Sequence, residues 1–462
     1  MNHQTLFLEW LNRIDSWMWG NFLLVLLVSV GLFLTLCLKG MQFRYLPYAL
    51  KLAFTRNDKD AQGDVSQFQS LMTALAATIG IGSIAGVATA IVAGGFGAIF
   101  WMWVIALIGM VTKFAEAILA VKFRIVDRKG EMCGGPMYYI SQGLGWKWLG
   151  VIFAIFCALS AFAGGNMTQS NSIALALQDL IHIPPLWTGI VLTGLTAFVL
   201  LGGIKNIGKI SAYLVPLMAL LYVVGGLIIL CLRIEKIPEG IFLIVKCAFN
   251  GQAALGGFLG ASVMNAVQLG VARGVSSNEA GLGSAPIAAA AAKTDVPGRQ
   301  ALISMTGVFL SSLVVCTITA LVVSVTDVLG SVGVDGKALN GATLVMQAFR
   351  SVLPGGSAIV AIGIVLFGYT TIVGWAYYGE KCIEFLVGEK LVVYYRALFC
   401  AVVLLGSVMS FDIVWPLVDI MNGLMAFPNL IALFALSGVV VAEANSFFAL
   451  VKREKIERNE LV

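Results

Sequence analysis

Long apolar stretches separated by short polar segments run through almost the whole chain. A window of roughly 20 residues, the helix length that crosses a bilayer, finds about eleven such stretches. Because backbone groups inside a bilayer must be satisfied within their own segment, these stretches predict transmembrane helices. Their expected limits are 20–38, 70–94, 97–122, 148–180, 185–203, 210–232, 250–292, 299–328, 356–386, 391–410 and 413–442.

Composition supports an integral membrane protein and argues against an enzyme. Of the 462 residues, 59% are hydrophobic and only 11% are charged, compared with roughly 25% charged in soluble domains. The eight cysteines form no C-x-x-C pair, and His3 and His182 are the two histidines, so neither a disulfide framework nor a metal site is predicted. A membrane-embedded hydrolase would need a nucleophile with a base, and a channel would generally need a repeated filter or charged rings. A transporter is the remaining class.

The distribution of basic residues predicts the orientation. With the N-terminus outside, the outer segments carry few of the 29 basic residues, and positive charge concentrates on the inside as the positive-inside rule requires. Residues before 20 are expected to form an interfacial helix, and residues 443–462 a cytoplasmic tail. The chain is therefore placed in the cell (inner) membrane. Its net charge of +5 is assigned to contact with anionic lipid, and no nucleic-acid partner is expected. The basic residues expected inside are Lys39, Arg44, Lys51, Arg56, Lys59, Lys122, Arg124, Arg128, Lys129, Lys205, Lys209, Lys293, Arg299, Lys452, Arg453, Lys455 and Arg458.

Two of the apolar stretches are interrupted by glycine, one within 73–90 and one within 251–270. Paired interruptions in the two halves of a membrane protein indicate a transporter with a site near the bilayer midplane. The interrupted spans are the second and the seventh. Two sets of five spans, 70–232 and 250–442, would thus enter the membrane from opposite sides as an inverted repeat, with 20–38 as an extra helix in a single transporter domain of residues 1–462.

Five motifs, in order along the chain, resemble the alanine/glycine:cation symporter family. They are GGFGAIFWMWVIALIG (94–109), GGPMYYI (134–140), GNMTQSNS (165–172), GVSSNEAGLGSAPIAAAAAKTDVPGRQA (274–301) and GWAYYGEKC (374–382). The resemblance implies an all-α, LeuT-like five-plus-five fold. It also implies cation-coupled uptake of alanine or glycine, usually with sodium as the co-transported ion.

The first glycine break is the expected substrate site. Around Gly80 and Gly82, the outer half-helix can direct N–H groups at a carboxylate, while the inner half leaves carbonyl groups for a cation. Thr78 adds a hydroxyl. The second break, near Gly260, is expected to complete the pocket. Close helix packing is the alternative explanation for these small residues.

Three further sites are suggested mainly by the resemblance. Gln169, in a polar stretch of the fourth span, is placed on the substrate; interhelical hydrogen bonding is the alternative for such residues. Thr370 and Thr371 resemble the hydroxyl pair that completes a sodium shell against carbonyls of the second span, and back-bonding to their own helix is the alternative. Trp375 either walls a small side-chain pocket or belongs to the core.

Charged residues inside spans are costly and call for partners. Lys113 and Glu116 are expected to pair with each other on one helical face. Arg273 and Glu279 are expected just inward of the second break, as parts of an inner gate. Asp419 and Asn422 share a face of the last span. Each of these groups is alternatively a static network that fixes helix register.

The predicted function is thus symport of alanine, glycine or both into the cell by alternating access, with sodium. A LeuT-like transporter of another small zwitterion, or one coupled to protons, is the alternative, and a channel comes third.

Overall fold

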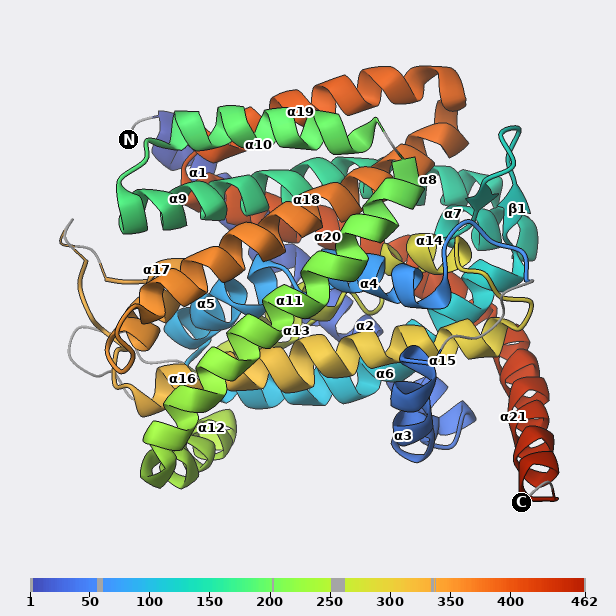
Figure 1. The fold of residues 1–462 in the computed structure, drawn as a ribbon, viewed down its shortest axis with the longest axis horizontal. Coiled ribbons are helices and arrows are strands. Elements are labelled where there is room, and N and C mark those ends of the chain that lie inside the picture. Colours follow the sequence, from blue (N-terminus) through green and yellow to red (C-terminus); the bar gives the residue numbers. More distant parts are fainter. Residues whose placement is uncertain are drawn as a thin grey trace.

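The computed structural model describes residues 3–55, 61–201, 203–250, 262–333, 336 and 338–460. In this part of the chain nearly all residues are helical. The one sheet is an antiparallel hairpin of β1 (Ile125–Val126) and β2 (Met132–Cys133). Long helices cross the molecule side by side, and the two ends of the chain lie toward opposite ends of its long axis (Figure 1).

Eight helices among the described residues are long and apolar enough to cross a bilayer. Three predicted spans are not in this set, because two of them are interrupted and one is short. The second is divided into α4 (Gln67–Thr78) and α5 (Ala85–Gly94), and the seventh into α13 (Val263–Asn278) and α14 (Ala285–Ala290). The fifth, α10 (Pro185–Leu200), has 16 residues. The eight long helices cover Leu8–Cys37, Gly97–Lys122, Lys147–Ile181, Gly203–Leu232, Pro297–Val325, Gly356–Val387, Glu389–Val408 and Val414–Ala435.

Helices at equivalent positions in the two predicted sets of five lie in contact. The pairs are α6 (Gly97–Lys122) with α15 (Pro297–Val308), α8 (Lys147–Phe162) with α18 (Gly356–Val387), α10 with α19 (Val392–Val408), and α5 with α13. Figure 1 shows α10 and α19 together along one edge. This pairing is what an inverted repeat would produce; the repeat boundaries at 70–232 and 250–442 remain predictions.

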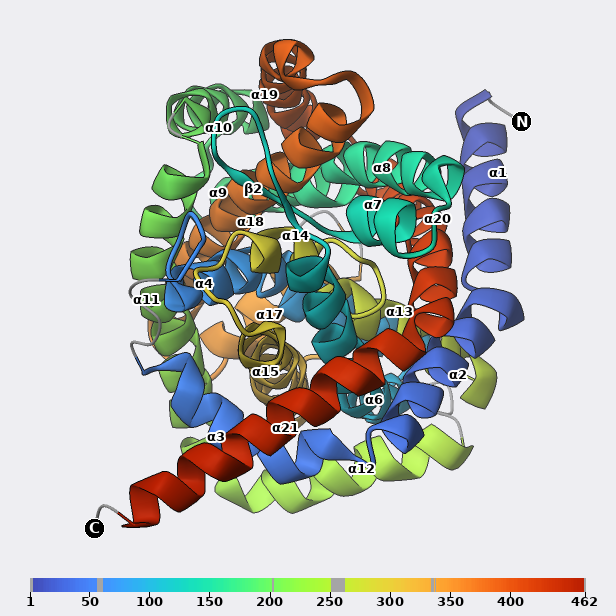
Figure 2. The ribbon, with the colours of Figure 1, turned by 90° about the vertical axis from the view of Figure 1, so that its right-hand side faces the viewer.

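Several helices lie across the ends of the long ones. In Figure 2, α10, α15 and α19 are viewed nearly end-on, whereas α21 (Ser437–Glu460) runs diagonally across the picture and α1 (His3–Met18) runs down its right-hand side. The other elements are α2 (Asn21–Cys37), α3 (Met41–Ala53), α7 (Pro136–Tyr138), α9 (Thr168–Ile181), α11 (Gly203–Leu232), α12 (Ile237–Asn250), α16 (Thr317–Val325), α17 (Gly341–Arg350) and α20 (Phe411–Ala435), with short 3-10 turns at Ile81–Ser83, Ile234–Lys236 and Glu389–Leu391 and π turns at Tyr139–Gly143, Ala163–Met167 and Phe309–Cys316.

Local sequence explains where the interrupted helices begin. Ser66 accepts from the backbone N–H of Gln69 at 3.1 Å, and the Gln69 side chain accepts from the N–H of Ser66 at 3.0 Å, which forms a capping box at the start of α4. Ser262 caps α13 in the same way through the N–H of Asn265 at 3.1 Å. Each half-helix therefore has its own start signal at the surface, and its other end lies inside the molecule.

Candidate functional site

A small cavity of about 40 Å³ lies where the two interrupted helices meet α9, α18 and α20. Its walls combine backbone of the breaks with hydroxyl, amide, indole and aliphatic groups. Such a mixture suits a small ligand that is partly polar. The lining residues are Ala77, Thr78, Gly80, Gly82, Gly164, Thr168, Gln169, Ser276, Glu279, Leu282, Thr371, Trp375, Trp415, Val418 and Asn422.

The first break falls where the sequence predicts it. Helix α4 ends at Thr78, a 3-10 turn covers Ile81–Ser83, and α5 begins at Ala85. The last carbonyl groups of α4 and the first N–H groups of α5 therefore point into the same region, with a partial negative end beside a partial positive end. Thr78 lines the cavity, but its hydroxyl donates back to the carbonyl of Ala74 at 2.9 Å.

Gln169 is held against this break by a widened turn between α8 and α9. Over Ala163–Met167 the helix makes a π turn, a feature frequent at functional sites. The Gln169 side chain donates to the carbonyl of Gly164 at 3.0 Å and accepts from the N–H of Ile81 at 3.4 Å. The amide thus already contacts the broken backbone and lines the cavity.

The two threonines of α18 point in different directions. Thr371 lines the cavity, and its hydroxyl donates to the carbonyls of Ala76 at 2.7 Å and Phe367 at 2.8 Å. Thr370 instead faces the sulfur of Met218 at 3.8 Å and bonds to the carbonyl of Phe367 at 3.0 Å. Only Thr371 reaches the end of α4, so the structure does not bring the predicted pair of hydroxyls together at the cavity.

Trp375, one turn further along α18, forms part of the cavity wall. It packs so closely on the π turn that a Cβ at Gly165 would lie 2.1 Å from the Cβ of Trp375. Glycine at position 165 is therefore required for this contact. The Trp375 ring also meets that of Tyr378 edge-to-face, with centroids 5.6 Å apart. The indole is thereby fixed in position.

The second break differs from the predicted one. Gly260 lies outside the described residues. Residues 262–270, within the predicted interruption, are the N-cap and first turns of α13. The helix stops instead at Glu279, whose φ of 57° is left-handed, and resumes at Ala285. This later break is the one that faces Gly82, where a Cβ would lie 3.3 Å from the carbonyl oxygen of Ser276.

Arg273 and Glu279 do not pair with each other. Arg273 forms a buried two-pronged ion pair with Asp419, its Nη1 lying 2.9 Å from Oδ1, and its guanidinium lies 4.8 Å from the centre of the Trp415 ring. The carbonyl of Asp419 also accepts from the indole N–H of Trp19 at 2.8 Å. This places Arg273 beside the N-terminal helix α1; its role in a gate stays a prediction. Glu279 lines the cavity itself.

Lys113 and Glu116 do not form the expected ion pair. The ammonium of Lys113 donates to the carbonyl of Asn278 at 2.9 Å, at the end of α13. Glu116 Oε1 accepts from the N–H groups of Gly281 at 3.0 Å and Gly283 at 3.1 Å. Both side chains therefore bond to backbone groups that are freed at the second break, and they do not bond to each other on α6.

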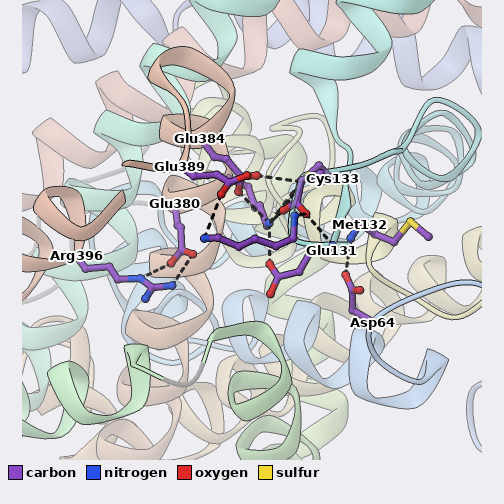
Figure 3. Close-up of polar contacts among 11 residues, drawn as sticks. Asp64, Glu131, Met132, Cys133, Glu380, Glu384, Glu389 and Arg396 are labelled. Carbon is purple, nitrogen blue, oxygen red and sulfur yellow. Dashed lines mark hydrogen bonds and ion pairs between the residues drawn. The ribbon is translucent and has the colours of Figure 1, made fainter. Parts of the chain in front are cut away.

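A second polar cluster lies where the β1–β2 hairpin meets α18 (Figure 3). The ammonium of Lys381 on α18 lies 2.9 Å from Glu384 and 3.1 Å from Glu131, and 3.4 Å from the sulfur of Cys133. Asp127 follows at 3.6 Å. Three of these groups could otherwise serve as metal ligands, but the ammonium lies among the same atoms. The cluster therefore acts as an ionic clasp that holds the β1–β2 hairpin on α18.

Burial and hydrogen bonding set the protonation of this hairpin. Burial raises the pKa of the Cys133 thiol to about 12, so the thiol is protonated at neutral pH. Burial acts to raise the pKa of Asp127 as well, but N–H groups of the hairpin and the Lys381 ammonium bring it below its ordinary value. Asp127 is thus an anion that accepts from the N–H of Lys129 and of Glu131, each at 2.8 Å.

Several cavity residues are not among the predicted site residues. Gly164, Ser276, Trp415 and Val418 line the cavity. The Ser276 hydroxyl is buried and has no hydrogen-bond partner among the residues that the structure describes. The available signals were a tryptophan in the last span and a serine beside the NEAG segment. Neither signal specifies a cavity without the fold.

Comparison with known proteins places the chain in a family. A family model described as the sodium:alanine symporter family matches residues 4–460. The sodium/alanine symporter AgcS of Methanococcus maripaludis is 53% identical over 453 residues, covering 97% of this chain and 99% of that protein. A probable sodium/glutamine symporter, GlnT of Bacillus subtilis, is 39% identical over 424 residues, covering 92% of this chain and 87% of that protein.

A solved structure of another protein has a similar fold. The crystal structure of MhsT in complex with L-phenylalanine superposes with a TM-score of 0.58 at 14% identity, covering 83% of this chain and 93% of that one. This likeness confirms the predicted LeuT-like fold. Together with the cavity at two facing helix breaks, the match over nearly all residues shows that the chain belongs to the sodium:alanine symporter family.

Proposed function

We propose that this transporter carries alanine, glycine or both into the cell together with sodium, by alternating access. The observation that carries the proposal is the small cavity at two facing helix breaks. It is lined by backbone of the breaks together with hydroxyl and amide side chains, among them Thr78, Thr371 and Gln169, as an amino-acid zwitterion with a monovalent cation requires. The name of the relative from Methanococcus maripaludis supports the same pair of solutes.

The carboxylate of the substrate belongs at the start of α5. The first N–H groups of α5, which begins at Ala85 just after the break at Gly80 and Gly82, form the positive end of that helix. Gln169 supports the same backbone and offers its amide to the bound molecule. Trp375, Leu282 and Val418 then leave little room beyond a methyl side chain.

The sodium ion belongs beside Thr371. The hydroxyl of Thr371 already approaches the carbonyl of Ala76 at 2.7 Å, so a cation there would find oxygen ligands on both α18 and the end of α4. Neutral oxygen atoms are sufficient for a monovalent ion. Thr370 is not required in this arrangement because its hydroxyl faces Met218.

The proposal also assigns an orientation in the membrane and a side to each of the two ionic clusters. With the N-terminus outside, the Arg273–Asp419 pair closes the outer side of the cavity, and the Lys381 clasp lies on the cytoplasmic side. The basic residues of the hairpin and of α21 then face the cytoplasm, in the cell (inner) membrane. Cysteines at Glu9 and Lys452, in a background without the natural cysteines, should react with an impermeant maleimide from opposite sides. Reaction of both from one side would overturn the orientation.

The test of the function is uptake of radiolabelled alanine by proteoliposomes. We expect an imposed sodium gradient, and not a proton gradient, to drive saturable accumulation. Unlabelled glycine should compete with alanine, whereas leucine and glutamate should not. Glutamine is an informative competitor because of the name of the Bacillus subtilis relative. Uptake driven only by protons would refute sodium coupling, and equal competition by leucine would refute a small pocket.

A further inference from the structure

Glu279 is a buried carboxylate that faces the cavity without a cation beside it. Its side chain is 2% exposed and forms part of the cavity lining. Its neighbours are neutral: the hydroxyl of Ser284 donates to Oε2 at 2.7 Å, and the indole of Trp375 lies beside the carboxylate. Among the ion pairs within 4.0 Å in the described part of the chain, none includes Glu279.

The neighbouring charges leave one negative charge unbalanced. Lys113, the cation near this break, serves two carboxylates, Glu116 and Glu279. Its ammonium donates to the carbonyl of Asn278 rather than contacting either of them at ion-pair distance. Glu116 is turned toward the backbone N–H groups of Gly281 and Gly283. The charge that remains uncompensated is therefore on the carboxylate that faces the cavity, and a buried charge of this kind is costly without a partner.

The end of α13 adds negative potential at the same place. The helix stops at Asn278, so the carbonyl groups of its last turn form the negative end of its dipole. One of them, the carbonyl of Ser276, lies close to Gly82 at the first break. The start of α5, which follows Gly82, is the positive end of another helix. The cavity is thus polarised, with its negative side at Glu279 and its positive side at the first break.

We infer that Glu279 binds the ammonium group of the transported amino acid. This assignment rests on the proposed function and specifies its substrate class: molecules with a protonated amine next to a carboxylate. The carboxylate of the substrate lies toward α5, and its ammonium lies between Glu279 and the last carbonyl groups of α13. A 2-hydroxy acid such as lactate has nearly the same shape as alanine but brings no positive charge, so the cavity excludes it.

The position of sodium is separate from this site. Thr371 lies one helical turn before Trp375, which is beside Glu279. The hydroxyl of Thr371 contacts the end of α4 at the carbonyl of Ala76 and does not contact Glu279. A sodium ion held there meets neutral oxygen atoms. Loss of the Glu279 charge should therefore weaken substrate binding much more than it changes the sodium requirement.

The experiment compares Glu279→Gln with Glu116→Gln in proteoliposomes with a saturating inward sodium gradient. Competition curves for alanine and for lactate against labelled alanine give the preference between the two, and a sodium titration at high alanine gives the ion requirement. We expect Glu279→Gln to weaken the affinity for alanine by roughly 10- to 150-fold, the range for losing charge-assisted hydrogen bonds. The preference for alanine over lactate should become smaller. Glu116→Gln removes an equal charge at the same break, but it should lower protein abundance or maximal rate without changing that preference.

Two results would overturn the assignment. One is an alanine affinity within twofold of wild type in Glu279→Gln. The other is a raised sodium requirement with alanine affinity retained, which would make Glu279 a sodium ligand.

If Glu279→Gln does not reach the membrane, the wild-type protein still tests the inference. Lactate should compete at least 100-fold more weakly than alanine, and competition within tenfold would contradict a charge-selecting site. Failure of the wild type to accumulate alanine with sodium would instead refute the proposed function itself.

Discussion

A methyl group added at Gly80 should interfere directly with the proposed sodium site. A Cβ built at this position would lie 2.7 Å from the hydroxyl oxygen of Thr371 and 3.3 Å from Oε1 of Gln169. The backbone at Gly80, with φ −105° and ψ −158°, is accessible to an L-residue, so the cost of Gly80→Ala comes from the steric contact alone. Thr371 must therefore turn or shift, and its hydroxyl leaves the carbonyl of Ala76.

The size of the effect follows from the contact. Overpacking a tight site costs about 1–3 kcal/mol, and at about 1.4 kcal/mol per factor of ten this corresponds to roughly a 5- to 150-fold weaker sodium affinity. We expect the sodium concentration for half-maximal alanine uptake to rise by a factor in this range. Proteoliposome uptake at fixed alanine and varied sodium is the assay.

Gly86→Ala is the matched control. Gly86 lies on α5, where an added Cβ would make only an ordinary contact of 3.8 Å with the Trp415 ring. This variant should transport with the sodium dependence of the wild type and gain some helix stability from the alanine. The reasoning is refuted if Gly80→Ala keeps the wild-type sodium requirement, or if both variants raise it equally.

Three further outcomes are expected. Thr371→Val, which keeps the shape and removes the hydroxyl, should raise the sodium requirement in the same uptake assay, whereas Thr370→Val should not; equal effects would contradict the different directions of the two side chains. Asp419→Asn leaves Arg273 buried without its counter-ion and should cost about 3–5 kcal/mol of stability, seen as a lower melting temperature in detergent. The double variant with Arg273→Gln should recover part of this loss, and a single variant as stable as the double one would count against the pair. Because burial raises the pKa of Cys133 to about 12, N-ethylmaleimide at neutral pH should label it only after denaturation, as read by mass spectrometry; rapid labelling of the folded protein would show that the hairpin does not stay closed on α18.

The two ionic closures have different origins in the sequence. The Lys381 clasp joins the end of one span to a polar hairpin, and the composition of that hairpin, with Asp127 and Glu131, already marks it as a surface segment. The Arg273–Asp419 pair joins residues 146 positions apart within apolar helices. From the sequence, each of the two residues could be recognised only as a buried charge that needs a counter-ion, and their pairing could not be predicted.

The sequence by itself determined the class of protein and the local properties of its helices. Apolar stretches of bilayer length must be helical, because every N–H and C=O inside the bilayer must bond within its own segment. The first break was also predictable, since Gly80 and Gly82 interrupt a helix whose N-terminal cap at Ser66 is local. These are properties of neighbouring residues, and neighbouring residues are visible in a sequence.

The second break and the assembly of the cavity were decided by tertiary structure. Both 251–270 and 279–284 are rich in small residues, and nothing local distinguishes them. The helix can stop at Glu279 because Glu116, from a helix 165 residues earlier, accepts the freed N–H of Gly281, and Lys113 binds the carbonyl of Asn278. In the same way, Thr370 and Thr371 are equivalent in sequence, and only the packing of α18 against α4 turns one of them to the cavity. Buried polar groups need partners, and in this protein those partners come from distant parts of the chain.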